Sequence, residues 1–580
     1  MKLTFNKQFM VLMFLLLNCF ASYAANEDLI TKQITLKLTE AGTLPNKIAS
    51  SEKNLVTNLK IIGEINGTDL RFIREMAGRD VEGHSTSGNL SVLDLSEARF
   101  VAGGDYYYCY SGHYYYTSND IIGASVFSDC RSLTSVIIPS SVTEIGWGVF
   151  KYCRSLTSVN IPSSVTTIGG SAFSGCHSLT SINIPSSVTE IREYTFENCS
   201  SLINVNISSS VTEIGYSAFS GCRSLTSVNI PSSVKSIERR AFSGCRSLTS
   251  VNIPLSVTRI ESGTFVNCTS LTSVNIPSSV TEIGESAFSC CRSLINVNIP
   301  FRVTSIGKGA FGGCSSLTSI NIPSSVTEIG GSVFSCCSSL INVNIPSSVT
   351  EIGYSAFSGC RSLTSVNIPS SVTTIGGSAF SCCSSLTSVN IPSSVTEIEE
   401  YTFGSCSSLI NVNIPSSVKI IEGRAFLCCS SLTSVNIPSS VTEIGEYAFW
   451  GCSSLTSVDI PSSVTSIGER AFYDCSGLRS IYVYAGTVPS TVAGAFEGCD
   501  SKNCTLYVPK GTYDAYWLTE WGYFENIVEF DAANIRNIVM EPEVQENARY
   551  AVNGQRLTAP VKGINLVKYN NGRVKKEIVK

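Results

Sequence analysis

Residues 222–234 read CRSLTSVNIPSSV, and residues 360–372 read the same letters again. The pattern recurs through most of the chain, because a cysteine returns every 23 residues. Such a regular period is typical of a solenoid, in which each repeat forms one coil and contacts only its neighbours. The sixteen cysteines that mark the units are at positions 130, 153, 176, 199, 222, 245, 268, 291, 314, 337, 360, 383, 406, 429, 452 and 475.

One unit, residues 153–175, shows how a coil is built. Its segment LTSVNI, residues 156–161, alternates polar and apolar side chains, which predicts a short strand with Ser158 and Asn160 facing solvent. Pro162 follows at once and lacks an amide donor, so it suits the end of a strand. The later apolar residues of the unit return the chain to the core, and the coil closes after 23 residues.

The coils are expected to stabilise one another by stacking. A lone coil cannot bury its apolar side, whereas stacked coils share a core in which each fully buried large apolar side chain contributes roughly 1.5–3 kcal/mol. With about 4.7–4.9 Å between neighbouring strands, the stack of repeats is roughly 75 Å long. We therefore predict a mostly β fold built on a parallel sheet.

Residues 431–452, SLTSVNIPSSVTEIGEYAFWGC, carry a resemblance to a known family. The unit resembles the BspA-like, or Treponema-type, leucine-rich repeat of surface proteins from anaerobic Gram-negative bacteria and some mucosal parasites, and the resemblance covers about residues 121–485. It implies a right-handed leucine-rich-repeat solenoid of about sixteen 23-residue coils, exposed on or released from the cell surface. For several members it also implies adhesion to host matrix proteins or to other bacteria.

Residues 1–24 have the pattern of a signal peptide. Lysines precede an apolar run at residues 9–17, and small residues near Ala24 suit cleavage, so the mature chain is expected to start at Ala25. An uncleaved anchor is one alternative, and a lipoprotein with residues 16–19, Leu-Leu-Asn-Cys, as its lipid-attachment box is a weaker one, because Asn18 is bulky where a small residue is expected. No later segment is apolar over enough residues to span a membrane, so we expect a protein that is secreted or lies on the outer cell surface of a bacterium.

Residues 26–120 are predicted to form a small N-terminal α/β cap over the open end of the solenoid. Residues 56–61 and 90–95 keep a degenerate LxxLxL pattern and are predicted strands. Residues 68–69, Thr-Asp, are suited to cap a short helix over residues 71–76 between these strands.

Three further segments follow the repeats. Residues 486–530 end in a run of aromatic side chains and are predicted to form a C-terminal cap, and the polar residues 531–546 are predicted to form a linker. Residues 547–580 contain two Asn-Gly pairs flanked by apolar alternation, which predicts a small β module. This tail is similar to C-terminal sorting domains of the type IX secretion route, although Asn565 stands where that pattern has an aromatic residue. A sorting domain and a stabilising tail are the two alternatives.

The sequence offers no catalytic, cofactor-binding or metal-binding constellation. His84, His113 and His177 are isolated from one another along the chain. A GxGxxG match at residues 307–312 includes Phe311, which is the recurring core aromatic residue of the repeat. The match is therefore a coincidence of the repeat. The net charge of −5 gives no electrostatic reason to bind nucleic acid. We therefore predict that the protein is not an enzyme.

The 24 cysteines of an exported chain raise the question of disulfides. We favour buried free thiols for the repeating cysteines, because pairing them would distort a regular stack, and coil-to-coil disulfides are the alternative. A pair of cysteines after the last unit, Cys499 and Cys504, is the better disulfide candidate, whereas Cys109 is left open. A second periodic set, two coils apart and too distant for mutual bonds, is at positions 290, 336, 382 and 428.

The candidate partner-binding residues lie on the polar side of the repeats and in one insertion. Ser158 and Asn160, like Ser227 and Asn229 in another unit, belong to ladders of neutral groups that a partner can contact at many equivalent points. The insertion, residues 103–120, supplies an aromatic patch for protein or carbohydrate, or alternatively packs its rings over the end of the solenoid. Its tyrosines are Tyr106, Tyr107, Tyr108, Tyr110, Tyr114, Tyr115 and Tyr116.

These observations favour a non-catalytic secreted or cell-surface protein that mediates protein–protein or cell adhesion, with host matrix or other cells as targets. The expected partners are protein or glycan ligands on host or bacterial surfaces, and no cofactor or nucleic acid is expected. The alternative function is structural: an envelope or biofilm-matrix protein whose periodic faces make homotypic contacts and which therefore self-associates.

Overall fold

The computed structural model describes residues 29–492, 494–531, 546–551, 556–557, 562–569 and 574–579. The predicted signal peptide, residues 1–24, and nearly all of the predicted linker, residues 531–546, lie outside the described residues. The predicted leucine-rich-repeat fold is confirmed, because the described part up to residue 531 is a solenoid of parallel strands with one antiparallel hairpin at residues 103–117. The strands of the C-terminal tail form a sheet of their own.

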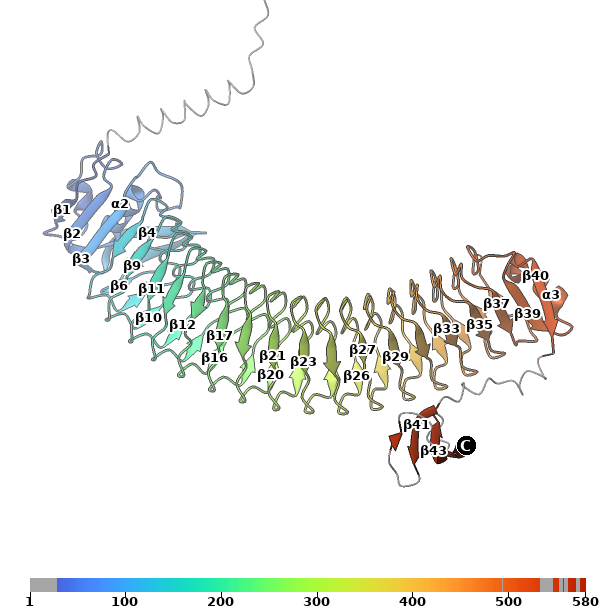
Figure 1. Ribbon diagram of the computed structural model, residues 1–580. Coiled ribbons are helices and arrows are strands. Elements are labelled where there is room, and N and C mark those ends of the chain that lie inside the picture. The colour runs from blue at the N-terminus through green and yellow to red at the C-terminus, as the bar shows by residue number, and fades with distance from the viewer. Residues whose placement is uncertain are drawn as a thin grey trace, which may run out of the picture.

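The repeats stack into a long, curved solenoid with two ladders of parallel strands (Figure 1). Most strands of the front ladder carry the Ser-x-Asn or Asn-x-Asn triplet, and within each sheet a strand pairs with the strand of the next coil, as Ser181 does with Asn204. Hydrogen bonding divides this ladder into sheets of five, two, six and eight strands along the stack. The front ladder comprises β1 (Ile34–Lys37), β2 (Asn58–Ile65), β3 (Val92–Phe100), β7 (Ser135–Ile137), β9 (Ser158–Asn160), β11 (Ser181–Asn183), β13 (Asn204–Asn206), β15 (Ser227–Val228), β17 (Ser250–Asn252), β19 (Ser273–Asn275), β21 (Asn296–Asn298), β23 (Ser319–Asn321), β25 (Asn342–Asn344), β27 (Ser365–Val366), β29 (Ser388–Asn390), β31 (Asn411–Asn413), β33 (Ser434–Asn436), β35 (Ser457–Ile460), β37 (Ser480–Val483), β39 (Thr505–Pro509) and β40 (Asn526–Phe530).

The second ladder consists of two-residue strands that in most coils follow a Pro-Ser-Ser turn. Ile191 pairs with Ile214 and both are buried, whereas Glu190 and Glu213 beside them reach solvent. The second ladder comprises β6 (Ile121–Ile122), β8 (Glu144–Ile145), β10 (Thr167–Ile168), β12 (Glu190–Ile191), β14 (Glu213–Ile214), β16 (Ser236–Ile237), β18 (Arg259–Ile260), β20 (Glu282–Ile283), β22 (Ser305–Ile306), β24 (Glu328–Ile329), β26 (Glu351–Ile352), β28 (Thr374–Ile375), β30 (Glu397–Ile398), β32 (Ile420–Ile421), β34 (Glu443–Ile444), β36 (Ser466–Ile467) and β38 (Ser490–Thr491).

A continuous stack of phenylalanine rings runs through the core. Neighbouring rings such as Phe288 and Phe311 are nearly parallel, with centroids 5.4 Å apart and planes 8° from each other. The stack extends from Phe127 to Phe496 with one ring per coil. Because each ring is buried by the rings above and below it, the stability of a coil depends on both neighbours.

The N-terminal cap is part of the front ladder. β1, β2 and β3 pair in parallel, and β3 joins the first regular coil through the pairing of Leu93 with Val136. The strands predicted at residues 56–61 and 90–95 are β2 and β3, each starting two residues later than predicted and running longer. A 3-10 helix, η1 (Leu44–Asn46), precedes β2.

The helix predicted over residues 71–76 begins earlier than expected. α2 (Gly67–Met76) has Asn66 as its N-cap, and the side-chain oxygen of Asn66 accepts a hydrogen bond from the amide of Thr68 at 3.0 Å. Asp69 completes a capping box by accepting a hydrogen bond from the amide of Asn66 at 2.9 Å. The predicted cap at Thr68 is therefore wrong, because asparagine caps a helix at least as well as threonine and stands earlier in the chain.

The repeat continues beyond the predicted boundary at residue 485. β38 pairs with β36, the ring of Phe496 stacks on that of Phe472 at 5.6 Å, and Cys499 Sγ donates a hydrogen bond to the carbonyl oxygen of Phe472 at 3.3 Å. These are the contacts of a regular coil, although its cysteine comes 24 residues after Cys475. With such degenerate turns at both ends, the solenoid has about 22 turns instead of the sixteen that the regular cysteines mark.

Aromatic side chains close the C-terminal end of the solenoid. α3 (Tyr513–Trp517) and η2 (Glu520–Tyr523) form the connection from β39 to β40, the last two strands of the front ladder. Tyr516 and Trp521 are fully buried, and the indole ring of Trp521 lies 4.8 Å from the ring of Phe496. The predicted C-terminal cap is thus built from residues after the last coil.

The described strands of the tail form a small antiparallel sheet in the order β42-β41-β43-β44. These strands are β41 (Glu546–Ala551), β42 (Arg556–Leu557), β43 (Gly563–Tyr569) and β44 (Val574–Val579). The two predicted Asn-Gly turns, at residues 553–554 and 571–572, lie outside the described residues. The sheet agrees with the predicted β module, and the likeness to a sorting domain stays a prediction.

Candidate binding surfaces

The tyrosine-rich insertion forms an antiparallel hairpin, which we call the tyrosine hairpin. It consists of β4 (Gly103–Tyr110) and β5 (His113–Thr117). Tyr108 faces Tyr115 and Cys109 faces Tyr114 across the hairpin, and a register shift separates these pairs from Gly103. The amide of Cys109 donates a hydrogen bond to the carbonyl oxygen of Val81 at 2.7 Å, so the hairpin is attached to the N-terminal cap.

One side of the tyrosine hairpin packs on the cap. Tyr107 is 1% exposed, burial raises the pKa of its phenol, and its hydroxyl donates a hydrogen bond to the carbonyl oxygen of Ala124 at 3.0 Å. The guanidinium of Arg74 lies 4.6 Å from the ring centroid of Tyr108, and the rings of Tyr108 and Tyr115 are 5.8 Å apart. These three tyrosines therefore pack over the end of the solenoid, as one of the two sequence alternatives held.

The other side of the tyrosine hairpin is open. Tyr110, Tyr114 and Tyr116 are 64%, 56% and 57% exposed. Tyr106 lies between the two sides: its ring is 4.8 Å from that of Tyr114 in an edge-to-face contact, and the guanidinium of Arg71 lies 4.8 Å from its centroid. The seven candidate tyrosines thus divide into a packed set and an exposed aromatic patch.

The front ladder presents the predicted rows of neutral polar groups. Ser158, Asn160, Ser227 and Asn229 are all exposed. Equivalent amides contact one another along the stack, as where Asn206 Nδ2 donates to Asn183 Oδ1 at 2.7 Å. Many hydroxyl and amide groups of this face therefore keep capacity for hydrogen bonds to a partner.

The repeating cysteines, Cys130 to Cys475, are called the ladder cysteines, and they are buried free thiols. From Cys153 onward, each donates to a carbonyl oxygen of a phenylalanine in the core stack, as Cys291 Sγ does to Phe265 O at 3.2 Å. Burial raises the pKa of these thiols, for Cys337 to about 12. They fill a niche in the core and are not poised for chemistry.

The predicted disulfide between Cys499 and Cys504 is absent from the structure, where both are free thiols. Cys499 is occupied by the coil contact described above, because it continues the ladder of thiols after Cys475. This position was not evident from the sequence, because Cys499 follows Cys475 by 24 residues instead of 23.

A second row of cysteines lies in left-handed turns just before the ladder cysteines. Cys336 and Cys428 are exposed, Cys290 and Cys382 are half-buried, and their φ angles lie between 57° and 60°. Glycine occupies the same turn in two of the three intervening coils, where Gly313 has a φ of 75° and Gly359 a φ of 73°. The row therefore presents thiols at alternate coils.

Two shallow cavities were not foreseen from the sequence. They enclose about 570 and 500 Å³ and lie beside Phe301 and Leu255, each 71% exposed, which replace the first serine of the Pro-Ser-Ser turn. Neither cavity is lined by a titratable side chain, so neither offers acid–base chemistry.

The described residues hold no cluster of side chains suited to a metal ion. They contain no group of three or more His, Cys, Asp or Glu side chains able to hold a metal. His177 Nδ1 lies 3.0 Å from the carbonyl oxygen of Asn198, and Phe311 of the GxGxxG match is a core ring. No helix in the described part of the chain has the length and apolar character needed to cross a bilayer.

Parallel ladders around one core define a leucine-rich-repeat solenoid, a fold that typically serves as a non-catalytic scaffold for protein interaction. The family described as BspA type leucine rich repeat region matches residues 120–249, 235–364, 332–456 and 443–516. The chain therefore belongs to the BspA type leucine-rich repeat family. Proteins of this family are typically bacterial surface proteins that act in protein–protein interaction.

Solved structures of bacterial leucine-rich repeat proteins are similar to this chain. One from Bacteroides ovatus ATCC 8483 is 30% identical, with a TM-score of 0.48, over 68% of this chain and 92% of that protein. A leucine rich cell surface protein from Faecalibacterium prausnitzii A2-165 is 30% identical, with a TM-score of 0.38, over 58% of this chain and 87% of that protein. The T. pallidum leucine rich repeat protein is 33% identical, with a TM-score of 0.27, over 34% of this chain and 82% of that protein. None of the curated proteins matches the chain significantly.

Proposed function

We propose that the protein is a secreted or surface-attached adhesion protein of a bacterium, which binds protein or glycan ligands without catalysis. The observation that carries this proposal is the front ladder, a long exposed face on which the same neutral hydroxyl and amide groups recur from coil to coil. A partner with repeated polar groups contacts such a face at many weak points at once, so affinity arises from multivalency.

The tyrosine hairpin supports the same proposal with a local site. Its exposed patch combines large rings with hydroxyl tips, and this combination is enriched where proteins contact partners. Tyr107 and Tyr108 hold the hairpin against the cap, so the exposed tyrosines stand on a packed support.

The proposal is tested by measuring binding of the full chain to immobilised host matrix proteins, mucins and neutral glycans. A variant with Tyr110, Tyr114 and Tyr116 changed to Ser leaves the packed tyrosines intact. We expect saturable binding to at least one ligand class, weakened about tenfold by this variant, because an interface centre loses aromatic anchors.

A matched control carries three exposed tyrosine-to-serine changes elsewhere, at Tyr152, Tyr354 and Tyr513. Binding that falls equally in both variants removes the tyrosine hairpin from the proposal. The absence of any ligand, together with self-association measured by sedimentation, replaces adhesion by the structural function.

A further inference from the structure

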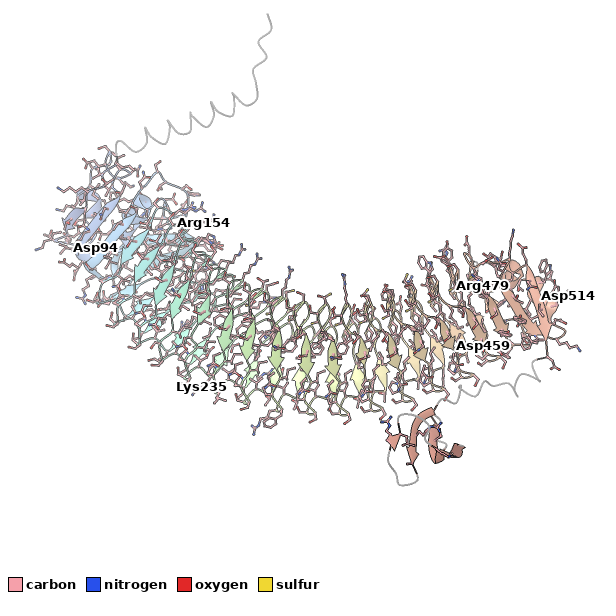
Figure 2. All side chains as sticks on the ribbon, in the orientation of Figure 1. Asp94, Arg154, Lys235, Asp459, Arg479 and Asp514 are labelled. Atoms are coloured by element: carbon pink, nitrogen blue, oxygen red, sulfur yellow. The ribbon has the colours of Figure 1, made fainter. Side chains whose placement is uncertain are left out.

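The inner rim is the concave edge of the solenoid, formed in each coil by a ladder cysteine and the two residues after it, such as Cys153–Ser155. Figure 2 shows Arg154 at this edge, and Lys235, which follows a Pro-Ser-Ser turn, at the convex edge. Backbone hydrogen bonds join the rims of neighbouring coils, as where the amide of Ser247 donates to the carbonyl oxygen of Arg223 at 3.1 Å.

Five arginines of the inner rim are exposed and unpaired. Each stands directly after a ladder cysteine, and within the described residues none has an ion pair or a hydrogen bond from its guanidinium. By contrast, Arg131 of the first regular coil pairs with Asp129 at 2.9 Å. The five are Arg154, Arg223, Arg246, Arg292 and Arg361.

Arginines on the side of the second ladder are mostly neutralised by glutamate. Arg259 lies 2.9 Å from Glu282, and Arg424 lies 2.6 Å from Glu400. Glutamates of the second ladder, such as Glu282, form ion pairs with the arginines on that side. The solenoid therefore separates its charges, with open positive charge along the inner rim.

The five unpaired arginines form a line whose intervals are multiples of one coil. From Arg154 to Arg223 is 69 residues, or three coils of 23, and the following intervals are one, two and three coils. At about 4.8 Å per coil, these intervals are roughly 15, 5, 10 and 15 Å, and the line is roughly 45 Å long. A single small anion would contact only one or two of these side chains, whereas a linear polyanion would contact them all.

The side chains around the arginines suit a partner rich in hydroxyl groups. Between Arg154 and Arg361 the other inner-rim positions are half-buried serines, one threonine and His177, and the cysteines are buried. This part of the rim thus lacks the aromatic anchors on which protein interfaces and single-stranded nucleic acid depend. The adjacent front ladder adds further exposed hydroxyls, such as those of Thr157 and Ser158.

We propose that the inner rim from Arg154 to Arg361 binds an anionic polysaccharide, a chain of hydroxyl-bearing sugars with carboxylate or sulfate groups, laid along the stack. The arginines bind the anionic groups through paired N–H donors, and the serines between them contact sugar hydroxyls. The local field of the rim attracts the polymer although the chain as a whole has a net charge of −5. This inference rests on the proposed binding function but uses a surface distinct from the tyrosine hairpin.

The test compares the full chain with a rim variant in which all five arginines become Ser. Serine occupies the same position in other coils, as at Ser200 and Ser315, so the variant is expected to fold. The matched control changes five other solenoid arginines, Arg239, Arg240, Arg259, Arg424 and Arg470, to Ser. Serine is native at each of these positions too, as at Ser262, Ser171 and Ser236. Circular dichroism verifies that both variants are folded.

The probes are heparin for sulfate, hyaluronan for carboxylate, and poly-glutamate as a polyanion without sugars. We expect the full chain to bind heparin or hyaluronan more tightly than poly-glutamate, with an affinity that falls as salt rises. The rim variant should bind at least about tenfold more weakly and with a shallower salt dependence, because it lacks five charge contacts. The control variant should stay within about twofold of the full chain, because its arginines are largely paired already.

Three outcomes overturn the inference: no binding of either polysaccharide by the full chain, equal losses in the rim and control variants, or equally tight binding of poly-glutamate. The last outcome assigns the rim to acidic proteins. If matrix ligands still bind while both polysaccharides fail, the proposed adhesion function stands and only this inference is lost. Heparin and hyaluronan used separately show whether sulfate or carboxylate is preferred.

Discussion

Tyr107 donates its hydroxyl to the carbonyl oxygen of Ala124 at 3.0 Å, and this bond joins the tyrosine hairpin to the first regular coil. The neighbouring Gly123 is packed so closely against the phenol that a Cβ at this position would collide with the hydroxyl oxygen. The hairpin and the coil therefore pack closely where the Tyr107 hydroxyl contacts Gly123 and Ala124.

Changing Gly123→Ala should destabilise the N-terminal end by about 1–3 kcal/mol, because the new methyl group overpacks the contact. Tyr107→Phe alone should cost about 1 kcal/mol, because the Ala124 carbonyl loses its donor. The double variant should be more stable than the sum of the two costs implies, since the colliding hydroxyl is gone. Thermal unfolding and hydrogen exchange over β4 and β5 measure these effects, and strictly additive costs would contradict the fit.

The N-cap of α2 gives a second prediction. Asn66→Ala should destabilise the cap by about 0.5–2 kcal/mol, because the amide of Thr68 and its neighbours lose their acceptor. Asn66→Ser is the matched control and should cost much less, because serine is also a good N-cap. Hydrogen exchange of the first turn of α2 separates the two, and equal protection in both variants would show that Asn66 is not the effective cap.

The period of the cysteines was enough to predict the solenoid, because stacking demands the same apolar positions in every coil. The fate of the tyrosines was not predictable in the same way. The register shift between Gly103 and Tyr108 breaks simple alternation along β4, so the side of each ring could not be inferred from its place in the sequence. Contacts with residues far along the chain, such as Arg74 with Tyr108 and Ala124 with Tyr107, show which tyrosines are packed.

The inner rim shows a different limit of the sequence. Arginine recurs in the sequence directly after ladder cysteines, but the residues that lie beside it in space come from other coils. Whether the charge of an arginine is paired depends on contacts such as the ion pair of Arg259 with Glu282. These two residues are 23 positions apart and belong to neighbouring coils. The Cys499 prediction failed for a related reason, because a single inserted residue concealed a coil that the core contacts reveal.

Thiol labelling should separate the two sets of cysteines. Cys336 and Cys428 are exposed and should react with an alkylating reagent in the native protein, whereas the ladder cysteines should be protected by roughly a hundredfold or more. Mass spectrometry of labelled peptides identifies the reactive positions, and unfolding in urea should make every thiol react. Rapid native labelling of a central ladder cysteine such as Cys291 would mean that the stack opens locally.

Alkaline pH should unfold the solenoid through its buried thiols. Burial raises the pKa of Cys245, Cys337 and Cys406 to about 12, above the ordinary value of 9.0. Below pH 9 both states hold the proton and the full stability is present, but above it the unfolded chain releases protons that the folded chain retains. The free energy of unfolding then falls by up to about 1.4 kcal/mol per thiol and pH unit until the folded pKa is reached.

With sixteen ladder cysteines in the regular repeats, the loss of stability should be steep, and ellipticity measured against pH should show cooperative unfolding between pH 9 and 12. A variant with Cys245, Cys337 and Cys406 changed to Ala removes three of these groups. It should be less stable at pH 7 by roughly 1–2 kcal/mol per site, since each change leaves a small cavity. Its stability should nevertheless decline less steeply with pH above 9, because fewer protons are released on unfolding. Parallel decline in the variant and the native chain would assign alkaline unfolding to other groups, such as the buried Tyr107.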